Sequence, residues 1–170
     1  MNHIENSYTT GEKTHLYGGA VSVQLPAGLL DASHVRPVPD TQEVFVAATT
    51  ASSVLSIIVD LLECVPGTTL DEIVDAHAKE LGLETGTAIS TIAIALDTLS
   101  EPLAELAGIR VFAATSSRPT IALGVLRLRA PAKTDVVITV TGGAATAEGV
   151  AEVARNVVAS FVVESPALFA

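Results

Sequence analysis

Two prolines, Pro37 and Pro39, lie close together in the stretch 36–45 (RPVPDTQEVF). Each proline ring fixes its own φ and withholds a backbone N–H, and each disfavours helix at the preceding residue. The stretch is therefore expected to be a stiff, extended connector. Asp40 follows the second proline and is of a residue type that is common in turns. The alternation of apolar residues that begins at Glu43 predicts a strand.

This connector carries three charged side chains, those of Arg36, Asp40 and Glu43. A stiff backbone presents such groups to a partner at a smaller ordering cost than a disordered loop would. The alternative is that Asp40 is only a turn residue and that Glu43 faces water at the start of a strand with no partner. Periodicity and composition alone favour this alternative, because most exposed charges are only solvated.

The chain has a formal net charge of -10. This charge argues against nucleic acid as a ligand, because phosphate binding requires clustered Lys and Arg, and it disfavours anionic membrane surfaces. Residues 40–105 contain twelve acidic residues and one basic residue, Lys79. Such a surface either steers a basic partner or only keeps the protein in solution. The single cysteine, Cys64, excludes an internal disulfide.

Residues 1–15 are polar and have neither a basic start nor an apolar signal segment, so we expect a flexible leader. Residues 16–170 are of a length that suits a single domain. No stretch has the apolar length that a bilayer span needs. The sequence therefore predicts one globular unit without insertion into a membrane.

Alternating apolar residues predict strands along much of the chain. The nearly unbroken apolar run of the third strand is typical of a central strand covered on both faces. For the fourth, the alanine content leaves helix open as a second choice. The expected strands are 20–25, 43–48, 54–63, 87–99, 109–114, 120–129 and 135–141.

Thr69 and Glu72 match a capping box, which predicts a helix that ends near Gly82. We expect His77 of this helix to be partly buried and to make a local hydrogen bond. A single helical turn is expected over 103–107 and a last helix over 145–163. The buried face of the first helix is predicted to be Leu70, Ile73, Val74, His77 and Leu81. The order of elements favours an α+β sandwich.

Arg127 and Arg129 lie two residues apart on one predicted strand and so share a face. They either bind the acidic tail of a partner, or protect an edge strand from pairing, or form salt bridges to nearby acids. No motif for nucleophilic, metal or nucleotide chemistry is present. Asp40 and Glu43 in a surface loop would keep ordinary acidity, which does not suit acid–base catalysis. We therefore expect a non-enzymatic protein without a cofactor or metal.

Four segments carry a resemblance to a known family. They are LYGGA from Leu16, the stretch 31–45 with Asp31, Ser33 and RPVPDTQEVF, SIIVDLLE from Ser56 and SPALFA from Ser165. They resemble the Ran guanine nucleotide release factor (Mog) family, small eukaryotic proteins that bind the GTPase Ran and act in nuclear import. The resemblance is close over 16–63 and weak over 64–120. It implies an α/β/α sandwich with a central, mainly antiparallel six- or seven-stranded sheet flanked by helices, similar to photosystem PsbP proteins.

The resemblance also implies a function. The expected protein is a monomer in the nucleus and cytoplasm that binds a Ran-type small GTPase and promotes release of its guanine nucleotide. Asp40 and Glu43 match the Ran-contacting surface of the family, and Asp31 and Arg36 match flanking positions. One alternative is a PsbP-like structural subunit of another assembly without Ran binding, and another is a small-molecule pocket beneath the helices.

Overall fold

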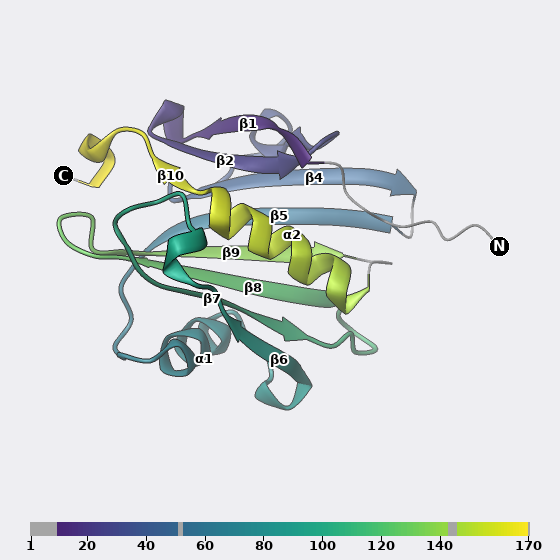
Figure 1. The fold of residues 1–170 in the computed structure, drawn as a ribbon. Helices are drawn as coiled ribbons and strands as arrows, with labels where there is room; N and C mark the ends of the chain where they lie inside the picture. Colours follow the sequence, from purple (N-terminus) through teal and green to yellow (C-terminus); the bar gives the residue numbers. More distant parts are fainter. Residues whose placement is uncertain (1–9, 51–52, 143–145, 170) are drawn as a thin grey trace.

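A seven-stranded antiparallel sheet forms the centre of the protein (Figure 1). The structure, a computed structural model, describes residues 10–50, 53–142 and 146–169. Every pair of neighbouring strands in this sheet is antiparallel, as predicted. In spatial order the strands are β3 (Leu30–Asp31), β4 (Gln42–Thr50), β5 (Ser53–Glu63), β9 (Thr134–Gly142), β8 (Thr120–Leu128), β7 (Ala104–Phe112) and β6 (Ala88–Ala93).

A small sheet and two helices pack on the large sheet. The small sheet has the order β1 (Thr10–Leu16), β2 (Val21–Pro26), β10 (Val162–Val163). Helix α1 (Leu70–Glu80) contacts β7 and β8, and α2 (Ala147–Ser160) contacts β2, β7, β8 and β9. Short 3-10 turns complete the chain: η1 (Tyr17–Gly19), η2 (Ala32–His34), η3 (Thr85–Thr87), η4 (Leu96–Thr98) and η5 (Pro166–Phe169).

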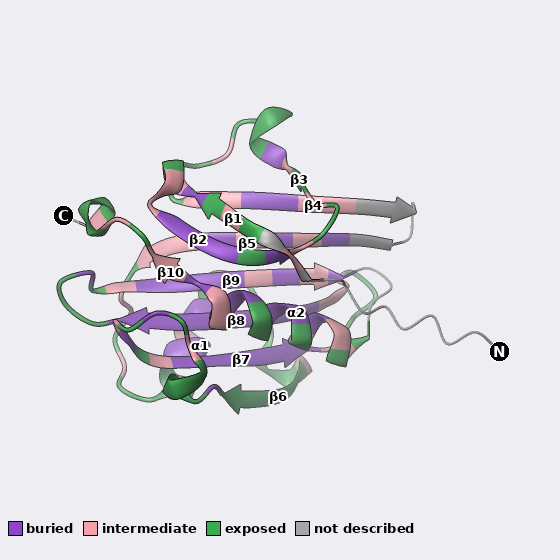
Figure 2. Ribbon diagram, turned by 45° about the horizontal axis from the view of Figure 1, so that its top comes forward, coloured by how far each residue is buried: buried purple, intermediate pink, exposed green. Residues whose placement is uncertain are grey.

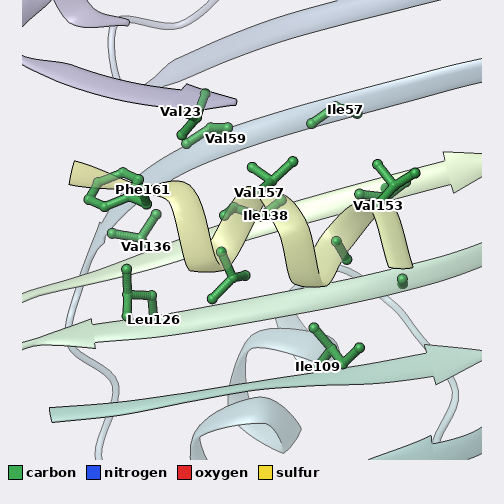
Figure 3. Close-up of a cluster of buried hydrophobic side chains, with 14 of the residues drawn as sticks. Val23, Ile57, Val59, Ile109, Leu126, Val136, Ile138, Val153, Val157 and Phe161 are labelled. Carbon is green, nitrogen blue, oxygen red and sulfur yellow. The ribbon is translucent and has the colours of Figure 1, made fainter. Parts of the chain in front are cut away.

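Helix α2 and the small sheet cover one face of the large sheet. Val153 and Val157 of α2 and the following Phe161 point onto the strands, where they meet residues such as Ile138 (Figure 3). Val23 of β2 belongs to the same cluster. Burial of this aliphatic surface, at roughly 25 cal/mol per Å², is the main term that holds the two sheets together.

Helix α1 covers the opposite face. Ile73 and Val74 pack with Phe112 of β7 and Leu123 of β8 in a second cluster. The alternation of side chains along each strand separates the two clusters, because neighbouring residues point to opposite faces. The capping box holds, with the Thr69 side chain accepting from the Glu72 amide and the Glu72 carboxylate accepting from Thr69.

Strand β5 differs from its prediction. Leu55, Ile57 and Val59 are buried, but Ile58 between them is only half-buried. The face opposite α2 is covered by α1 over β7 and β8, so this helix does not close that face at β5. Coverage of both faces had been predicted because the residues on both faces of this strand are apolar.

Long-range pairing overrides three other local predictions. Residues 103–107 do not form a helical turn, because from Ala104 on they pair with β8 as part of β7. The predicted leader 1–15 is wrong from Thr10 on, since β1 pairs with β2; residues 1–9 lie outside the described part. The last helix ends at Ser160 rather than 163, because Val162 and Val163 pair with β2.

Helix α1 also ends differently from the sequence prediction. Leu81 is the C-cap residue and is 51% exposed, so it does not belong to the buried face. Gly82 follows with a φ of 71°, a left-handed conformation that favours glycine, and Leu83 becomes buried in its place. Among the described residues, neither helix has the length and apolar character of a membrane span.

Candidate functional site

The connector between η2 and β4 runs past one edge of the large sheet. Arg36 and Asp40 are exposed on it. The Gln42 amide donates to the Pro39 carbonyl at 2.9 Å and closes the expected turn around Asp40. The predicted combination of stiff connector, turn and strand is confirmed. Asp40 therefore projects into solvent from a backbone that is restrained on both sides.

Glu43 lies in β4, opposite Val59 of β5. It is half-buried, and its carboxylate accepts a 2.7 Å hydrogen bond from the backbone amide of Tyr17. The interpretation in which Glu43 faces water without a partner is therefore wrong. Twenty-six positions separate the two residues, so local sequence could not indicate this contact.

Tyr17 links three segments of the chain. Its hydroxyl donates to the carbonyl of Thr41 at 2.7 Å and lies 3.1 Å from the carbonyl of Val59. Burial raises the pKa of this hydroxyl far above its ordinary value, and the nearby carboxylates of Asp60 and Glu43 raise it further, so it stays a donor. We name Tyr17, Thr41 and Glu43 the tyrosine clamp.

The backbone of Tyr17 has an unusual conformation. Its φ is 53°, in the left-handed region that non-glycine residues rarely adopt. Gly18 and Gly19 continue with φ values of 68° and 97°. The two glycines thus permit the tight turn, while the hydrogen bonds of the clamp hold the one residue for which that conformation costs energy.

Asp31 caps η2 at the edge strand β3. Its carboxylate accepts from the Ser33 amide at 2.9 Å. Partial burial acts to raise the pKa of this carboxyl, but the hydrogen bond from Ser33 and the nearby His34 outweigh it, so the pKa lies below its ordinary value. Asp31 pairs with Phe45 of β4, which places it beside the strand that carries Glu43.

The four predicted site residues therefore lie on consecutive segments at the β3–β4 edge. Asp31 and Glu43 are half-buried and bound to backbone amides, whereas Arg36 and Asp40 are exposed. Sequence reasoning missed Tyr17, which holds these segments together. Its position in the LYGGA segment was the only available signal.

Two exposed apolar side chains accompany these charges. Leu30 is 75% exposed and Val35 is 84% exposed, and both belong to the segment around β3 and η2 that projects beyond β4 (Figure 2). An apolar centre with a polar rim is the usual composition of a protein–protein interface. Neither residue had been predicted as a contact, since a single exposed apolar residue in a loop carries no pattern.

A hollow of about 370 Å³ lies beside Asp40. Tyr17 and Thr41 of the clamp line it, together with Asp40 and apolar side chains from β5 and η5. The lining is apolar at Leu61, Leu62, Ala132, Leu168 and Phe169, and besides Asp40 it is charged at Glu63 and Lys133, so that acidic side chains outnumber basic ones. An acidic group next to an apolar hollow suits a partner side chain with an apolar stem and a basic end.

Arg127 does not belong to this surface. It is buried, and its guanidinium donates to both carboxylate oxygens of Asp135, at 2.7 and 2.8 Å. It also donates to the carbonyls of Val65 and Gly67. The prediction of a salt bridge is confirmed for Arg127, whereas an edge position is wrong because β8 lies inside the sheet. Arg129 is exposed.

Asp135 is also the partner of the buried histidine. Its carboxylate lies 2.8 Å from His77 Nε2, across 58 positions, so the predicted local hydrogen bond is wrong. Burial acts to raise the pKa of Asp135, but hydrogen bonds from Arg127, His77 and the Val65 amide hold it well below its ordinary value. The hydrogen bond to Asp135 in turn raises the pKa of Arg127. This buried network ties α1 to the sheet.

Chemically, the described residues favour binding over catalysis. Within the described ranges, no three His, Cys, Asp or Glu side chains are grouped so that they could hold a metal ion. The exposed Arg36 and Asp40 stand on a restrained backbone next to apolar surface. Such an arrangement can form charge-assisted hydrogen bonds to a protein partner.

Comparison with known proteins supports a binding role. Residues 14–142 match the family described as Ran-interacting Mog1 protein. The nuclear import protein MOG1 of Saccharomyces cerevisiae is 40% identical over 84 residues, which are 45% of this chain and 38% of that protein. The Ran guanine nucleotide release factor of Homo sapiens is 54% identical over 48 residues, 28% of this chain and 24% of the human protein. The alignments thus span less than half of either relative.

The similarity of the fold extends much further. The crystal structure of the Saccharomyces cerevisiae Ran-binding protein Mog1p matches with a TM-score of 0.67 and 29% identity, over 95% of this chain and 100% of the other. A structure of a glutamate-to-alanine mutant of Mog1 matches with the same TM-score at 28% identity, over 94% and 98%. These matches confirm the predicted α+β architecture. The family match covers more than half of the residues of this chain, so the chain belongs to the family of Ran-interacting Mog1 proteins.

Proposed function

We propose that this protein binds a Ran-type GTPase, promotes release of its guanine nucleotide and so regulates nuclear protein import. The family assignment supports the class of partner. It also supports a regulator that is not itself an enzyme, in line with the relative named Ran guanine nucleotide release factor. The protein is proposed to act as a monomer in the nucleus and cytoplasm.

One observation carries the choice of site. Asp40 is exposed on a proline-restrained turn whose neighbour, Thr41, is held by the Tyr17 hydroxyl at 2.7 Å. A carboxylate on such a backbone forms an ion pair at little ordering cost. Arg36 supplies a second exposed charge on the same connector, and Asp31 and Glu43 complete the proposed contact surface from its two flanks.

The proposed mechanism is a competition for Ran's basic groups. A GTPase holds its nucleotide through a P-loop lysine, backbone amides and Mg²⁺. A partner that binds the nucleotide-free form more tightly shifts the population toward that form and speeds release. Carboxylates on the restrained connector would draw basic side chains away from the phosphates, while the apolar hollow beside Asp40 receives their stems.

Release of a fluorescent guanine nucleotide from Ran tests this proposal. The wild-type protein is expected to accelerate release, and Asp40→Lys to reduce Ran binding by about tenfold or more, which corresponds to about 1.4 kcal/mol. Asp40 is exposed, so this variant should keep the wild-type midpoint of urea unfolding.

Glu43→Lys is a poorer test than Asp40→Lys, because it also removes the acceptor of the Tyr17 amide. Leu81→Ala, on an exposed residue at the end of α1, provides a control away from the proposed site. Unchanged Ran binding by Asp40→Lys and Arg36→Glu in titration calorimetry would refute the site. If the wild type neither binds Ran nor speeds release, the proposed function is wrong, and the PsbP-like structural role becomes the better hypothesis.

A further inference from the structure

The second edge of the large sheet is unusually unprotected. Strand β6 lies at the end opposite β3, and all six of its residues are exposed (Figure 2). Its sequence, AISTIA, contains neither a charge nor a proline. Natural edge strands usually carry a charged residue or a proline, which prevents pairing with another chain. A bulge between Ala88 and Ser90 is the one irregularity, and it leaves Ser90–Ala93 regular.

The free backbone groups of β6 can be identified from its register. The amide of Ile94 donates to the carbonyl of Ala107 on β7 at 2.9 Å. In an antiparallel ladder, hydrogen-bonded and non-hydrogen-bonded positions alternate. Since Thr91 faces Arg110 and Ala93 faces Gly108 in the same register, the N–H and C=O groups of Thr91 and Ala93 point away from the sheet. They are available to a further strand.

An apolar groove runs between β6 and helix α2. It has a volume of about 660 Å³. Ile89 and Ile92 of β6 line it and are 56% and 39% exposed. Val111 of β7 and the small residues Ala147 and Ala151 of α2 also line it. A strand added along β6 would place alternate side chains into this groove.

The charges around the groove select the occupant. Glu148 and Glu152 line it from α2, against a single cation, Arg155. Exposed carboxylates also stand before and after β6, at Glu84 and Asp97. A strand with basic side chains complements this rim. A second copy of this chain, with a net charge of -10, would be repelled by it.

We infer that the outer edge of β6 is a β-augmentation site for an extended peptide segment of another protein, with alternating apolar and basic side chains. Main-chain hydrogen bonds to Thr91 and Ala93 supply affinity, and the groove and its carboxylates supply specificity. The site lies at the opposite sheet edge from Asp40. It is therefore separate from the proposed GTPase contact and can be occupied at the same time.

Fluorescence anisotropy with a synthetic fluorescein-labelled peptide of alternating valine and lysine tests this inference on the full chain. Saturable binding is expected for this peptide, and binding about tenfold weaker for the matched peptide of valine and glutamate. Ala93→Pro removes one outward amide without removing a ladder bond to β7, so it should be tolerated at an edge. It is expected to weaken the lysine peptide about tenfold or more.

Two further variants keep the test decisive if Ala93→Pro does not fold. Glu148→Lys with Glu152→Lys, on the exposed side of α2, is expected to weaken the lysine peptide about fivefold or more. Asp40→Lys should bind it as the wild type does. Absence of saturable binding, or equal affinity in the wild type and in the folded β6 and α2 variants, would overturn the inference. A wild-type dimer in sedimentation equilibrium that Ala93→Pro abolishes would also overturn it, because a second copy would then occupy the edge.

Discussion

The backbone amide of Tyr17 and the carboxylate of Glu43 form a 2.7 Å hydrogen bond that joins the turn before β2 to the strand after the proline connector. The same tyrosine binds the Thr41 carbonyl through its hydroxyl. Two segments that the sequence identified separately, LYGGA and RPVPDTQEVF, are thus parts of one structural unit. The shape of the proposed GTPase-binding surface depends on both.

Removal of the Tyr17 hydroxyl tests this dependence. Tyr17→Phe removes one donor from the Thr41 carbonyl, which still accepts from the Leu61 amide, and one from the Val59 carbonyl, so we expect the free energy of unfolding to fall by about 0.5 to 1.5 kcal/mol. Ran affinity should fall several-fold, since the turn around Asp40 loses its support. Urea unfolding and titration calorimetry measure the two effects. Asp40→Lys should show the contrasting pattern, with lost affinity and unchanged stability; wild-type behaviour of Tyr17→Phe in both assays would refute the clamp.

Two substitutions of Glu43 separate its structural role from its charge. Glu43→Gln keeps an oxygen that can accept from the Tyr17 amide, whereas Glu43→Ala leaves this amide unsatisfied at a cost of about 1 to 3 kcal/mol. We therefore expect the midpoint of thermal unfolding to fall clearly for Glu43→Ala and only slightly for Glu43→Gln. If the carboxylate contacts Ran, both variants bind Ran weakly. Full binding by Glu43→Gln would restrict Glu43 to a structural role.

The Arg127–Asp135 pair predicts a response of stability to pH. The pKa of Asp135 is lowered in the folded state, so its stabilisation is complete above the ordinary aspartate pKa of about 3.9 and is lost as the pH falls from there toward the folded-state value. Urea unfolding from neutral to acidic pH should show this loss. Asp135→Asn should be less stable at neutral pH by about 3 to 5 kcal/mol and have a shallower acid slope, because Arg127 is left unpaired.

Other carboxyls with lowered pKa values, those of Asp31, Glu72 and Glu164, contribute to the same acid slope in both proteins. The informative quantity is therefore the difference between wild type and Asp135→Asn at each pH. If the difference in the free energy of unfolding between wild type and Asp135→Asn stayed constant as the pH falls, the prediction for Asp135 would be wrong.

Gly108 tests the packing of α1 on the sheet. A Cβ at this position would lie 2.9 Å from the Ile92 carbonyl oxygen and would also meet the Leu70 side chain. Gly108→Ala is therefore expected to cost about 1 to 3 kcal/mol by overpacking. Gly86→Ala is the matched control, since a Cβ there meets nothing within 4 Å. Equal unfolding midpoints for the two variants would contradict the close approach of α1 to β7.

The elements predicted correctly are those whose signal is local. The capping box at Thr69 and the turn at Asp40 depend on residues a few positions apart, and the structure contains both. The proline connector and the antiparallel order of the strands are of the same kind. Proline spacing predicted the stiff connector that carries Asp40 and Arg36, whereas the resemblance to the family assigned them as contacts; the structure shows both side chains exposed.

Tertiary structure alone decided the rest. Residues 104–107 became strand because β8 supplies a ladder of hydrogen bonds that one isolated helical turn could not match. Asp135 became the partner of His77 and Arg127 because an unpaired charge in the core would be costly. The sequence by itself thus determined the turns, the caps, the periodic faces and the family. Which distant groups meet, at the tyrosine clamp as in the buried network, was decided by packing, because these contacts join residues that no local pattern connects.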